Sequence, residues 1–367
     1  MAGGNGVGIL PAEEIAAAFA GGEIRAGRPL DADQIQPASL DLRLGRSAYR
    51  VRASFLPGPR MSVAARLTEL TLHEIDLSAG AVLETGCVYI VPLLESLALP
   101  ATIEASANPK SSTGRLDIFT RVITDRAQSF DTIPAGYSGP LYLEVSPRTF
   151  PIVARTGSRL SQIRFRRGET RLSDAALTEL HAAQTLVDGA PQFSAGLLLS
   201  IDLAGRGGRD SVIGYRAKRH TGVIDVDRRA AYELLDYWEP IAARGRPELV
   251  LDPDQFYILV SREAVHVPPD YAAEMVAFDP LVGEFRVHYA GFFDPGFGHD
   301  AAGGAGSRAV LEVRSHEVPF ILEDGQIVGR LVYEKMAARP AVLYGSGLGS
   351  NYQAQGLKLS KHFRPAS

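Results

Sequence analysis

The chain repeats itself once at a fixed distance, and this repeat limits its possible folds more than any other feature of the sequence. The block VLETGCVYIVPLLESLALP begins at Val82 and the block VLDPDQFYILVSREAVHVP begins at Val250, so the offset is 250 − 82 = 168. A second pair of blocks shares Leu-Glu-Val, with its acid at Glu144 and at Glu312, and again 312 − 144 = 168. Because this period is far too long for a solenoid, the sequence predicts one domain that is used twice.

Short β-rich runs, bounded by Gly, Pro, Asp or Ser, dominate both copies. VYIV and PLYLEV in the first copy, and FYILV and RAVLEV in the second, are typical of strands. They predict an all-β fold, a distorted barrel or jelly roll duplicated in tandem with a few short helices. Capping and stop signals place the expected helices at 11–22, 172–189 and 227–238. The expected domains are 1–170 and 191–367, joined by a linker helix at 171–190.

The composition is that of an ordinary globular protein, and it disfavours several classes of function. The net charge is −4 and the pI is near 6.1, so no general basic field attracts nucleic acid. Cys87 is the single cysteine, which excludes an internal disulfide and a thiolate cage for a metal. The N-terminus lacks the pattern of a signal peptide, and the longest apolar run is too short to span a bilayer. We therefore expect a cytoplasmic protein that binds neither nucleic acid nor a membrane.

The stretch NPKSSTGRL places two hydroxyls between two cations. Lys110 is a point charge and Arg115 offers a planar fork of donors, and both suit phosphate oxygens. Ser111 and Ser112 add hydroxyl donors, and the small Gly114 would let backbone N–H groups approach an anion. Such a stretch alone is more often a polar turn, and it is not a Walker A loop. The local pattern leaves both a polar turn and an anion site open.

Several motifs, in order along the chain, resemble the dCTP deaminase branch of the dUTPase superfamily. They are QIQPASLDLRLG at 34–45, KSSTGRL at 110–116, AGYSGPLYLE at 135–144, AGFFDPGFG at 290–298, VLE at 310–312 and YGSGLGSNYQAQG at 344–356. Their order and spacing agree over nearly the whole chain. The doubled length is similar to the two-repeat bacterial form of that family.

The resemblance implies a dUTPase-like fold and a homo-oligomer with trimer-like packing of repeats, in which active sites lie between subunits. It implies that dCTP is the substrate, that water attacks C4 of cytosine, and that dUTP and ammonia are the products. It also implies a reaction without zinc, with Mg²⁺ bound to the triphosphate, and with dTTP or dUTP as candidate inhibitors.

A reaction without zinc needs a carboxylate that takes a proton from water and returns it to the leaving amine. The zinc deaminase signature needs several cysteines, which the single Cys87 cannot supply. Glu144 and Glu312 lie in the apolar runs LYLEV and AVLEV, where the alternation of side chains need not expose them. A strand glutamate on its own more often faces solvent, but the resemblance implies catalysis by at least one of the two.

The two copies differ in a complementary way. At the 168 offset the second copy has FDPLVGEF in place of KSSTGRLD, so Glu284 corresponds to Arg115 with one residue of slip. An acid there would repel a triphosphate. The second copy instead keeps the family's hairpin, with His288 close to the site and Asp294 in the sugar-reading place, where the first copy has Pro134.

We therefore predict a composite site. The first copy supplies Ser111 and Arg115 as catalytic groups, and the second supplies Glu312, with Glu144 as the second choice. The predicted substrate-binding residues are Lys110, Ser112, Gly114, His288, Asp294, Val310, Leu311, Tyr344 and Gln355. In a competing interpretation the first-copy sites pair with each other and use Glu144.

Two other functions stay open on the sequence alone. One is a dUTP diphosphatase, or a bifunctional enzyme that continues to dUMP, because a dUTPase carries its water-activating Asp in the same hairpin as Asp294. The other is a non-catalytic nucleotide-binding or regulatory protein, because duplicated domains often lose activity. Retention of Ser111 and Arg115 disfavours the second. The Gly/Ala-rich segment 298–308 fits either a plain loop or a mobile gate.

Overall fold

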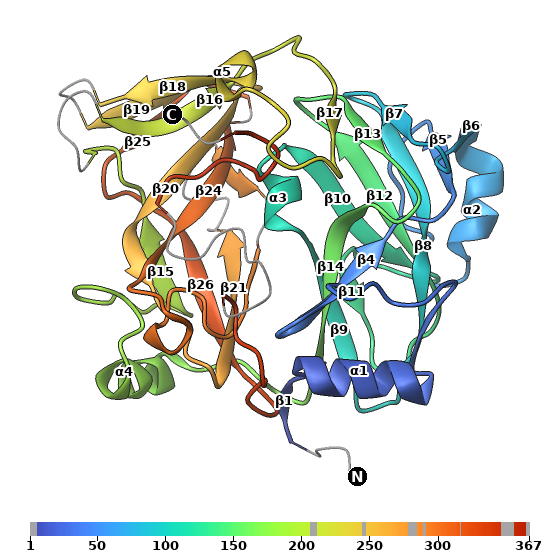
Figure 1. Ribbon diagram of the computed structural model, residues 1–367, viewed down its shortest axis with the longest axis horizontal. Coiled ribbons are helices and arrows are strands. Elements are labelled where there is room, and N and C mark those ends of the chain that lie inside the picture. Colours follow the sequence, from blue (N-terminus) through green and yellow to red (C-terminus); the bar gives the residue numbers. More distant parts are fainter. Residues whose placement is uncertain are drawn as a thin grey trace. The chain divides into compact units, whose positions relative to one another are not determined.

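The structure is a computed structural model that describes residues 6–205, 211–243, 247–277, 285–288, 291–315, 317–345 and 356–364 (Figure 1). The chain divides into two compact units. Unit 1 comprises Met1–Thr170, His220–Tyr232 and Met336–Ala341, and unit 2 comprises Arg171–Arg219, Glu233–Lys335 and Val342–Ser367. The units are not contiguous in sequence, because two short segments of the second half belong to unit 1.

The described residues of unit 1 form two main sheets, one smaller sheet and three helices. The first sheet has the order β11 (Thr132–Ile133), β9 (Glu104–Pro109), β14 (Arg159–Arg167), β4 (Ser39–Arg43) and β3 (Ile35–Gln36), with β1 (Gly8–Ile9) also on β14. The second has the order β10 (Ile118–Thr124), β12 (Ser138–Pro147), β8 (Val88–Ala98), β5 (Ser47–Val51) and β6 (Thr71–Asp76), with β2 (Ile24–Ala26) on β8. The smaller sheet is β17 (Ile224–Asp225), β13 (Ile152–Ala154) and β7 (Ala81–Leu83). The helices are α1 (Ala12–Gly21), α2 (Val63–Leu70) and α3 (Ser111–Gly114).

Unit 2 repeats this arrangement. Its first sheet has the order β15 (Leu197–Ser200), β26 (Ile327–Lys335), β21 (Tyr271–Ala277) and β23 (Phe292–Phe293). Its second has the order β18 (Trp238–Ala242), β16 (Val212–Ala217), β20 (Phe256–Val265), β24 (Ser307–Ser315) and β22 (Phe285–His288). The remaining elements are the pair β19 (Glu248–Leu251) and β25 (Phe320–Glu323), helices α4 (Asp174–Ala183) and α5 (Leu234–Tyr237), and the 3₁₀ helix η2 (Asp300–Ala302).

Strand register shows that the sequence repeat is a structural repeat. In unit 1, Tyr89 of β8 pairs with Val145 of β12. In unit 2, Tyr257 of β20 pairs with Val313 of β24, and both partners are displaced by the same offset that separates the sequence blocks. The expected duplicated all-β fold is therefore confirmed.

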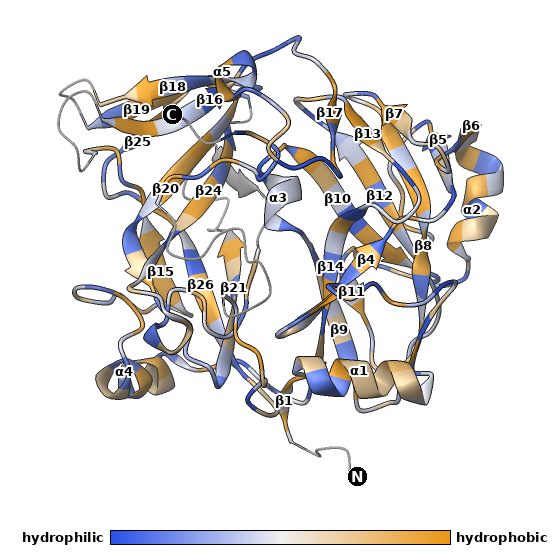
Figure 2. Cartoon of the chain, in the orientation of Figure 1, coloured by the Kyte–Doolittle hydropathy of each residue, from blue (hydrophilic) through white to orange (hydrophobic). Residues whose placement is uncertain are grey.

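The core of unit 2 follows from the alternation of side chains along its strands. Ala309, Leu311 and Val313 of β24 all lie in its main apolar cluster, so the odd-numbered residues of this strand face the core. Figure 2 shows the resulting mixture of hydrophobic and hydrophilic residues along individual strands. Glu312 consequently belongs to the opposite face of the sheet.

Two of the predicted helices are present, although one is shorter than expected. Helix α1 matches the first, and Gly22 ends it in the left-handed region at φ 80°. Helix α4 begins after Ser173, whose hydroxyl accepts a hydrogen bond from Ala176 N–H at 3.3 Å, but it ends at Ala183 rather than near Gly189. No helix in the described part of the chain is long and apolar enough to cross a bilayer.

The third predicted helix, at 227–238, is largely wrong. Only Leu234–Tyr237 is helical. The preceding chain is drawn into unit 1, where Ile224 of β17 pairs in parallel with Ile152 of β13. Tyr232 accepts a hydrogen bond from Asp225 N–H at 2.6 Å, and the residues between them form turns and bends rather than a helix. Tertiary pairing has overridden a local helical pattern.

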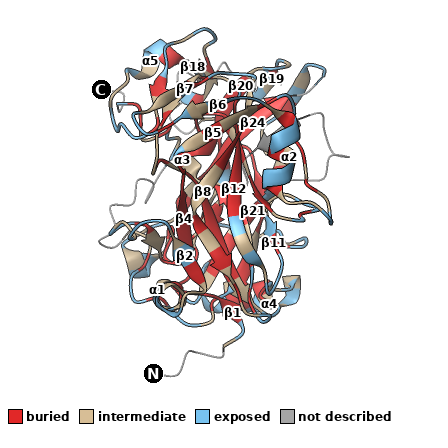
Figure 3. Cartoon of the chain, turned by 90° about the vertical axis from the view of Figure 1, so that its right-hand side faces the viewer, coloured by how far each residue is buried: buried red, intermediate tan, exposed pale blue. Residues whose placement is uncertain are grey.

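Helix α2 is not among the predicted helices, although its sequence carries a helix signal. Ser62 caps it by accepting a hydrogen bond from Ala65 N–H at 3.2 Å. Val63, Leu67 and Leu70 are buried at helical spacing, while much of the remaining helix surface is exposed (Figure 3).

Candidate active site

The predicted anion-binding stretch forms a tight turn in unit 1, where helix α3 directly follows β9. Lys110 O accepts hydrogen bonds from the N–H groups of Thr113 and Gly114, at 2.8 and 3.0 Å. Ser111 O accepts one from Arg115 N–H at 3.1 Å. These three N–H groups are used within the turn, so side chains must supply much of any contact with an anion.

A buried carboxylate holds the ammonium group of Lys110. Lys110 Nζ forms an ion pair with Asp41 Oδ1, and Arg159 NH1 lies 3.6 Å from the other oxygen of Asp41. Asp41 is buried and Lys110 is half-buried. The positive charge of Lys110 is therefore partly balanced within unit 1.

Burial of its side chains and the backbone conformation at Asp117, where the chain leaves the turn, fix the rest of the turn. Ser112, Gly114 and Arg115 are buried, and Ser111 is half-buried. Asp117 leaves the turn in the left-handed region at φ 55°, and its carboxylate accepts a hydrogen bond from Thr149 Oγ1 at 2.5 Å. A turn held in this way presents its hydroxyl and guanidinium groups in one arrangement.

In unit 1, Glu144 is clamped by an arginine that the sequence analysis missed. Glu144 lies in β12 opposite Ile90 and Arg121, and only 2% of its side chain is exposed. Arg121 donates to its Oε1 from Nε at 3.0 Å and from NH2 at 2.7 Å. Oε2 is buried and has no hydrogen-bond partner among the described residues.

Aromatic rings and an apolar cluster close over this clamp. The guanidinium carbon of Arg121 lies 3.5 Å from the ring centre of Phe130 and 4.8 Å from that of Phe119. Ile90 belongs to a cluster with residues of the segment 51–70, including those of α2. Since directly paired strand residues share a face, Glu144 lies on the sheet face that this cluster covers.

In unit 2, Glu312 occupies the corresponding position in β24. It is 5% exposed and pairs with Ile258 of β20 and with residue His288 of β22. Val310 and Leu311, predicted to bind substrate, precede it in the same strand, and Leu311 faces the core. The register partner of the glutamate is thus histidine in unit 2 and arginine in unit 1.

The end of the chain packs on the sheet face that carries Glu312. Register and alternation place Trp238, Phe256 and Glu312 on one face of the sheet. The ring of Phe363 lies 6.0 Å from that of Trp238 and 5.4 Å from that of Tyr237, measured between ring centres. Arg364 forms an ion pair with Glu233.

The predicted sugar-reading hairpin lies beside the start of the tail. Asp294 is buried directly after β23, and Phe297 N–H donates to its carbonyl oxygen at 3.1 Å. Tyr344 N–H donates to Pro295 O at 2.8 Å, and the ring of Tyr344 lies 5.7 Å from that of Phe297. The structure therefore brings Asp294 and Tyr344 into one neighbourhood.

Glycine is required where the tail crosses this hairpin. Gly296 has φ 96°, and a Cβ atom there would meet Leu343 Cβ at 2.8 Å. The nearby segment 298–308 is a sequence of turns around η2, in which Gly304 N–H donates to His299 O at 2.9 Å.

Strand pairing also supports the alignment of Pro134 with Asp294. In unit 1, Ile133 of β11 pairs with Ala105. In unit 2, Phe293 of β23 pairs with Ala273, which corresponds to Ala105 by the sequence repeat, since 273 − 105 = 168. Pro134 and Asp294 each follow these paired residues directly, so proline stands in the first hairpin where the second has an acid.

Other predicted residues lie outside the described part of the chain. These are Gln355 in the tail and Glu284, the predicted counterpart of Arg115. Within the described residues, no group of three or more His, Cys, Asp or Glu side chains is arranged to hold a metal ion.

The structure combines a duplicated all-β fold with a serine–arginine turn in one repeat and a buried strand glutamate in each. The N-terminal domain model of 2′-deoxycytidine 5′-triphosphate deaminase matches residues 6–169, and the C-terminal domain model matches residues 173–363. The chain belongs to the 2′-deoxycytidine 5′-triphosphate deaminase family, and the assignment made from its motifs is confirmed.

Individual relatives agree with this family. The crystal structure of 2′-deoxycytidine 5′-triphosphate deaminase from Agrobacterium tumefaciens is 70% identical, with a TM-score of 0.87 over 90% of this chain and 100% of that chain. A dUMP-forming dCTP deaminase of Corynebacterium glutamicum (strain R) is 33% identical over 139 residues, 37% of this chain and 68% of the relative. A dCTP deaminase of Haemophilus influenzae (strain Rd) is 32% identical over 119 residues, 30% of this chain and 58% of the relative.

Proposed function

We propose that this protein deaminates dCTP to dUTP. The observation that carries this proposal is the match of both family domain models, together with 70% identity to a crystal structure titled as this deaminase. In the reaction, the oxygen of water bonds to C4 of cytosine, the bond from C4 to the exocyclic nitrogen breaks, and ammonia leaves.

The proposed site combines one half from each repeat. Unit 1 contributes Ser111 and Arg115, whose hydroxyl and forked guanidinium can meet phosphate oxygens and the reacting base. Unit 2 contributes Glu312, Asp294 and the tail. Such a division explains why the serine–arginine turn occurs in one repeat and the acid-bearing hairpin in the other.

We propose Glu312, rather than Glu144, as the group that moves protons. Arg121 donates twice to Glu144, and protonating that carboxylate would leave a largely buried guanidinium without its counter-charge. Glu144 is also covered by the apolar cluster around α2, which obstructs the approach of water. The register partner of Glu312 is residue His288, where that of Glu144 is Arg121.

The carboxylate of Glu312 would take one proton from water as the oxygen attacks. It would then return that proton to the exocyclic nitrogen, while the second proton of the water passes to N3 of the base, so that the carboxylate is unchanged after each turnover. The chain has one cysteine, which favours this metal-independent route over the zinc deaminase signature.

The triphosphate brings further expectations. Mg²⁺ would enter bound to the substrate phosphates and neutralise part of their charge. Ser111, Ser112 and Arg115 would then select the triphosphate over the monophosphate or nucleoside. A homo-oligomer with trimer-like packing of repeats, and inhibition by dTTP or dUTP, are the corresponding proposals for assembly and regulation.

The direct test is to incubate purified protein with dCTP and Mg²⁺ in the presence of a zinc-selective chelator. Ammonia release and formation of a deaminated nucleotide are the expected results. Activity that is lost with the chelator and restored only by zinc would contradict the metal-independent route. An equal rate with deoxycytidine would contradict the phosphate role of the turn.

A second candidate is a bifunctional enzyme that also hydrolyses dUTP to dUMP and diphosphate. The observation in its favour is that the relative from Corynebacterium glutamicum is named dUMP-forming. Chromatography of the products decides between the two, because the bifunctional enzyme yields dUMP and diphosphate from dCTP, whereas the simple deaminase stops at dUTP.

A further inference from the structure

One strand edge is covered by a further strand in unit 1, and its counterpart in unit 2 is not. In unit 1, β17, β13 and β7 form a three-stranded sheet in which β17 covers the outer edge of β13 (Figure 1). In the described part of unit 2, β25 pairs only with β19, so this sheet has two strands. Unit 1 therefore supplies a template for a segment that would cover the edge in unit 2.

Strand register shows that β25 is the counterpart of β13. Val153 of β13 pairs with Val82 of β7, and Ile321 of β25 pairs with Val250 of β19. Both partners are displaced by the repeat, since 321 − 153 = 168 and 250 − 82 = 168. The inner edges of the two strands are thus paired in the same way, and the difference lies at the outer edges.

The turns that follow these two strands support the same alignment. In unit 1, Arg155 N–H donates to Ser158 Oγ at 2.9 Å. In unit 2, Glu323 N–H donates to Gln326 Oε1 at 3.2 Å, and both residues are again displaced by 168, since 323 − 155 = 326 − 158 = 168. Glu323 therefore stands where unit 1 has Arg155, so the charge at this position is reversed.

Backbone hydrogen bonds hold β17 in parallel on the outer edge of β13 in unit 1. Ile224 N–H donates to Pro151 O at 3.0 Å, and Val226 N–H donates to Val153 O at 3.1 Å. The side chains of Ile224 and Val226 are buried. This edge therefore accepts an extended segment with aliphatic residues at alternate positions.

The residues between these aliphatic positions match the charge at the end of β13. Arg155 NH1 and NH2 donate to the two carboxylate oxygens of Asp225, at 2.7 and 3.0 Å. NH1 also donates to Asp227 Oδ2 at 2.8 Å. The strand that covers β13 thus combines an apolar face with acids that pair with Arg155.

The corresponding edge of unit 2 is apolar and exposed. Ile321 is 56% exposed, whereas its counterpart Val153 is half-buried. Val250, its pairing partner, and Val318, just before β25, are each 49% exposed. An exposed strand edge with aliphatic side chains is suited to pairing with a segment of another chain.

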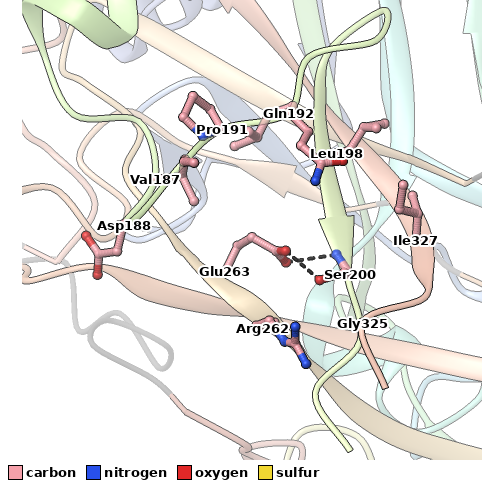
Figure 4. A pocket seen from close by; sticks show the side chains of 12 residues that line it. Val187, Asp188, Pro191, Gln192, Leu198, Ser200, Arg262, Glu263, Gly325 and Ile327 are labelled. Atoms are coloured by element: carbon pink, nitrogen blue, oxygen red, sulfur yellow. Dashed lines mark hydrogen bonds between the residues drawn. The ribbon is translucent and has the colours of Figure 1, made fainter. Parts of the chain in front are cut away.

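Acidic side chains lie near both ends of β25. Glu323 is exposed and lies directly opposite Glu248, where like charges repel each other. Glu317, ahead of the strand, is a further exposed acid. Arg262, which lines a pocket of about 520 Å³ (Figure 4), already forms an ion pair with Asp324. A cation from a partner would relieve the repulsion at Glu323.

The first repeat does not supply an equivalent of β17. β17 belongs to the connection between β16 and β18, and the corresponding connection between β5 and β6 contains helix α2. Residues of α2 are buried in the apolar cluster of unit 1, so this segment is already packed. A second copy that met the edge through its own β25 would place Glu323 against Glu323. Connectivity and charge therefore favour a different protein as the partner.

We propose that the outer edge of β25 is a docking site for an extended, basic segment of a partner protein. The segment would add to β25 in parallel, as β17 adds to β13. Its aliphatic residues would take the positions of Ile224 and Val226. Its lysine or arginine residues would take the positions of Asp225 and Asp227 and would pair with Glu323.

The test measures binding of two fluorescein-labelled peptides to the full chain by fluorescence anisotropy. The acidic peptide TGVIDVDG copies residues 221–227, and the basic peptide TGVIKVKG has lysine in place of both acids. The basic peptide should bind saturably with a Kd up to about 1 mM, as expected for one short added strand. The acidic peptide should bind at least about tenfold more weakly. Equal binding of the two peptides, or no saturable binding of the basic one, would overturn the proposal.

Reversal of one charge locates the site. Glu323→Arg restores the cation that unit 1 has at this position, so this variant should bind the acidic peptide at least about tenfold more tightly than the basic one. Glu179→Arg, on the exposed face of α4, is the matched control and should leave the preference for the basic peptide unchanged. An unchanged preference in Glu323→Arg would contradict the assignment.

Hydrogen exchange distinguishes strand addition from a contact between charges alone. The basic peptide should slow amide exchange in the segment 318–323, and slower exchange only elsewhere would contradict strand addition. Self-association of the chain that slows exchange in this same segment would assign the edge to a second copy and overturn the proposal. Because the readouts are peptide binding and exchange, their failure leaves the proposed deamination untouched.

Discussion

At the scale of single residues, the two strand glutamates occupy one position of the repeat but differ in their surroundings. Glu144 and Glu312 have equivalent registers, opposite Ile90 and Ile258. The two glutamates differ in their register partner on the neighbouring strand, which is Arg121 for Glu144 in unit 1. A carboxylate that neutralises a largely buried guanidinium serves stability well, but it serves poorly as a base that must change its charge.

The pair between Arg121 and Glu144 gives a stability prediction. Arg121→Met should destabilise the protein by roughly 3 kcal/mol, near the low end for a broken buried pair, because the arginine side chain is 25% exposed. Urea unfolding measures this loss. The double variant R121M/E144M should recover most of it. A single variant as stable as the wild type would show that the pair does not balance the buried charge.

The serine–arginine turn gives a catalytic prediction. Arg115→Ala should nearly abolish deamination, because it removes a buried forked donor and leaves its partners unsatisfied. Ser111→Ala should lower kcat by roughly 10- to 1000-fold, the usual range for a lost transition-state donor. Steady-state rates with dCTP measure both effects. Near-normal rates in both variants would show that the turn has only a structural role.

At the scale of secondary-structure elements, equivalent sheet faces are covered by different segments. In unit 1, helix α2 and the residues before it pack over the face of Glu144. In unit 2, Phe363 near the C-terminus packs on Trp238 on the face of Glu312. The chain between β16 and β18 includes β17, which pairs with β13 within unit 1.

The tail therefore gives an element-scale prediction. Deleting the chain after Ser350 should abolish most deamination, because it removes Gln355 together with the packing of Phe363. Phe363→Ala is the sharper variant. It should raise KM for dCTP and lower kcat while leaving the core strands folded, as circular dichroism can verify. Full activity of the truncated chain would contradict a role of the tail in the site.

The attachment of β17 gives a prediction about pH. A hydrogen bond from Arg155 holds the pKa of Asp225 below its ordinary value of 3.8, so the bond stabilises the folded state above that pH. The contribution is lost as the pH falls through the lowered pKa of the folded state. Asp225→Asn should cost up to about 1 kcal/mol near neutral pH, since Arg155 is partly exposed, and the cost should shrink below about pH 4. Unfolding measured at both pH values tests this, and a cost independent of pH would contradict it.

At the scale of the whole molecule, the repeat explains how much of the fold is predictable from the sequence. A constant offset between two separated blocks requires two copies of one architecture, and alternating strands require that architecture to be β-rich. The prediction for 227–238 is largely wrong because the strand just before it, β17, pairs with β13, which lies far away in sequence. Likewise, nothing local to Arg121 indicates that it will meet Glu144, because the contact depends on the register between β10 and β12.

The division of chemistry between the repeats is the central claim about the whole molecule. Unit 1 has the serine–arginine turn, and its apolar cluster covers its own strand glutamate, Glu144. Unit 2 retains the acid-bearing hairpin and places the chain end on the face of its glutamate. In the proposed division, each repeat would supply only part of the catalytic groups.

The most direct test is to compare kcat/KM for dCTP in Glu312→Gln and Glu144→Gln. Glu312→Gln should lose at least about 100-fold, the scale of a lost general base, while its fold is unchanged. Glu144→Gln should keep most activity per folded molecule, and R121M/E144M serves as its charge-balanced control. The reverse result, with Glu144 essential and Glu312 dispensable, would show that the first repeat carries the sites alone.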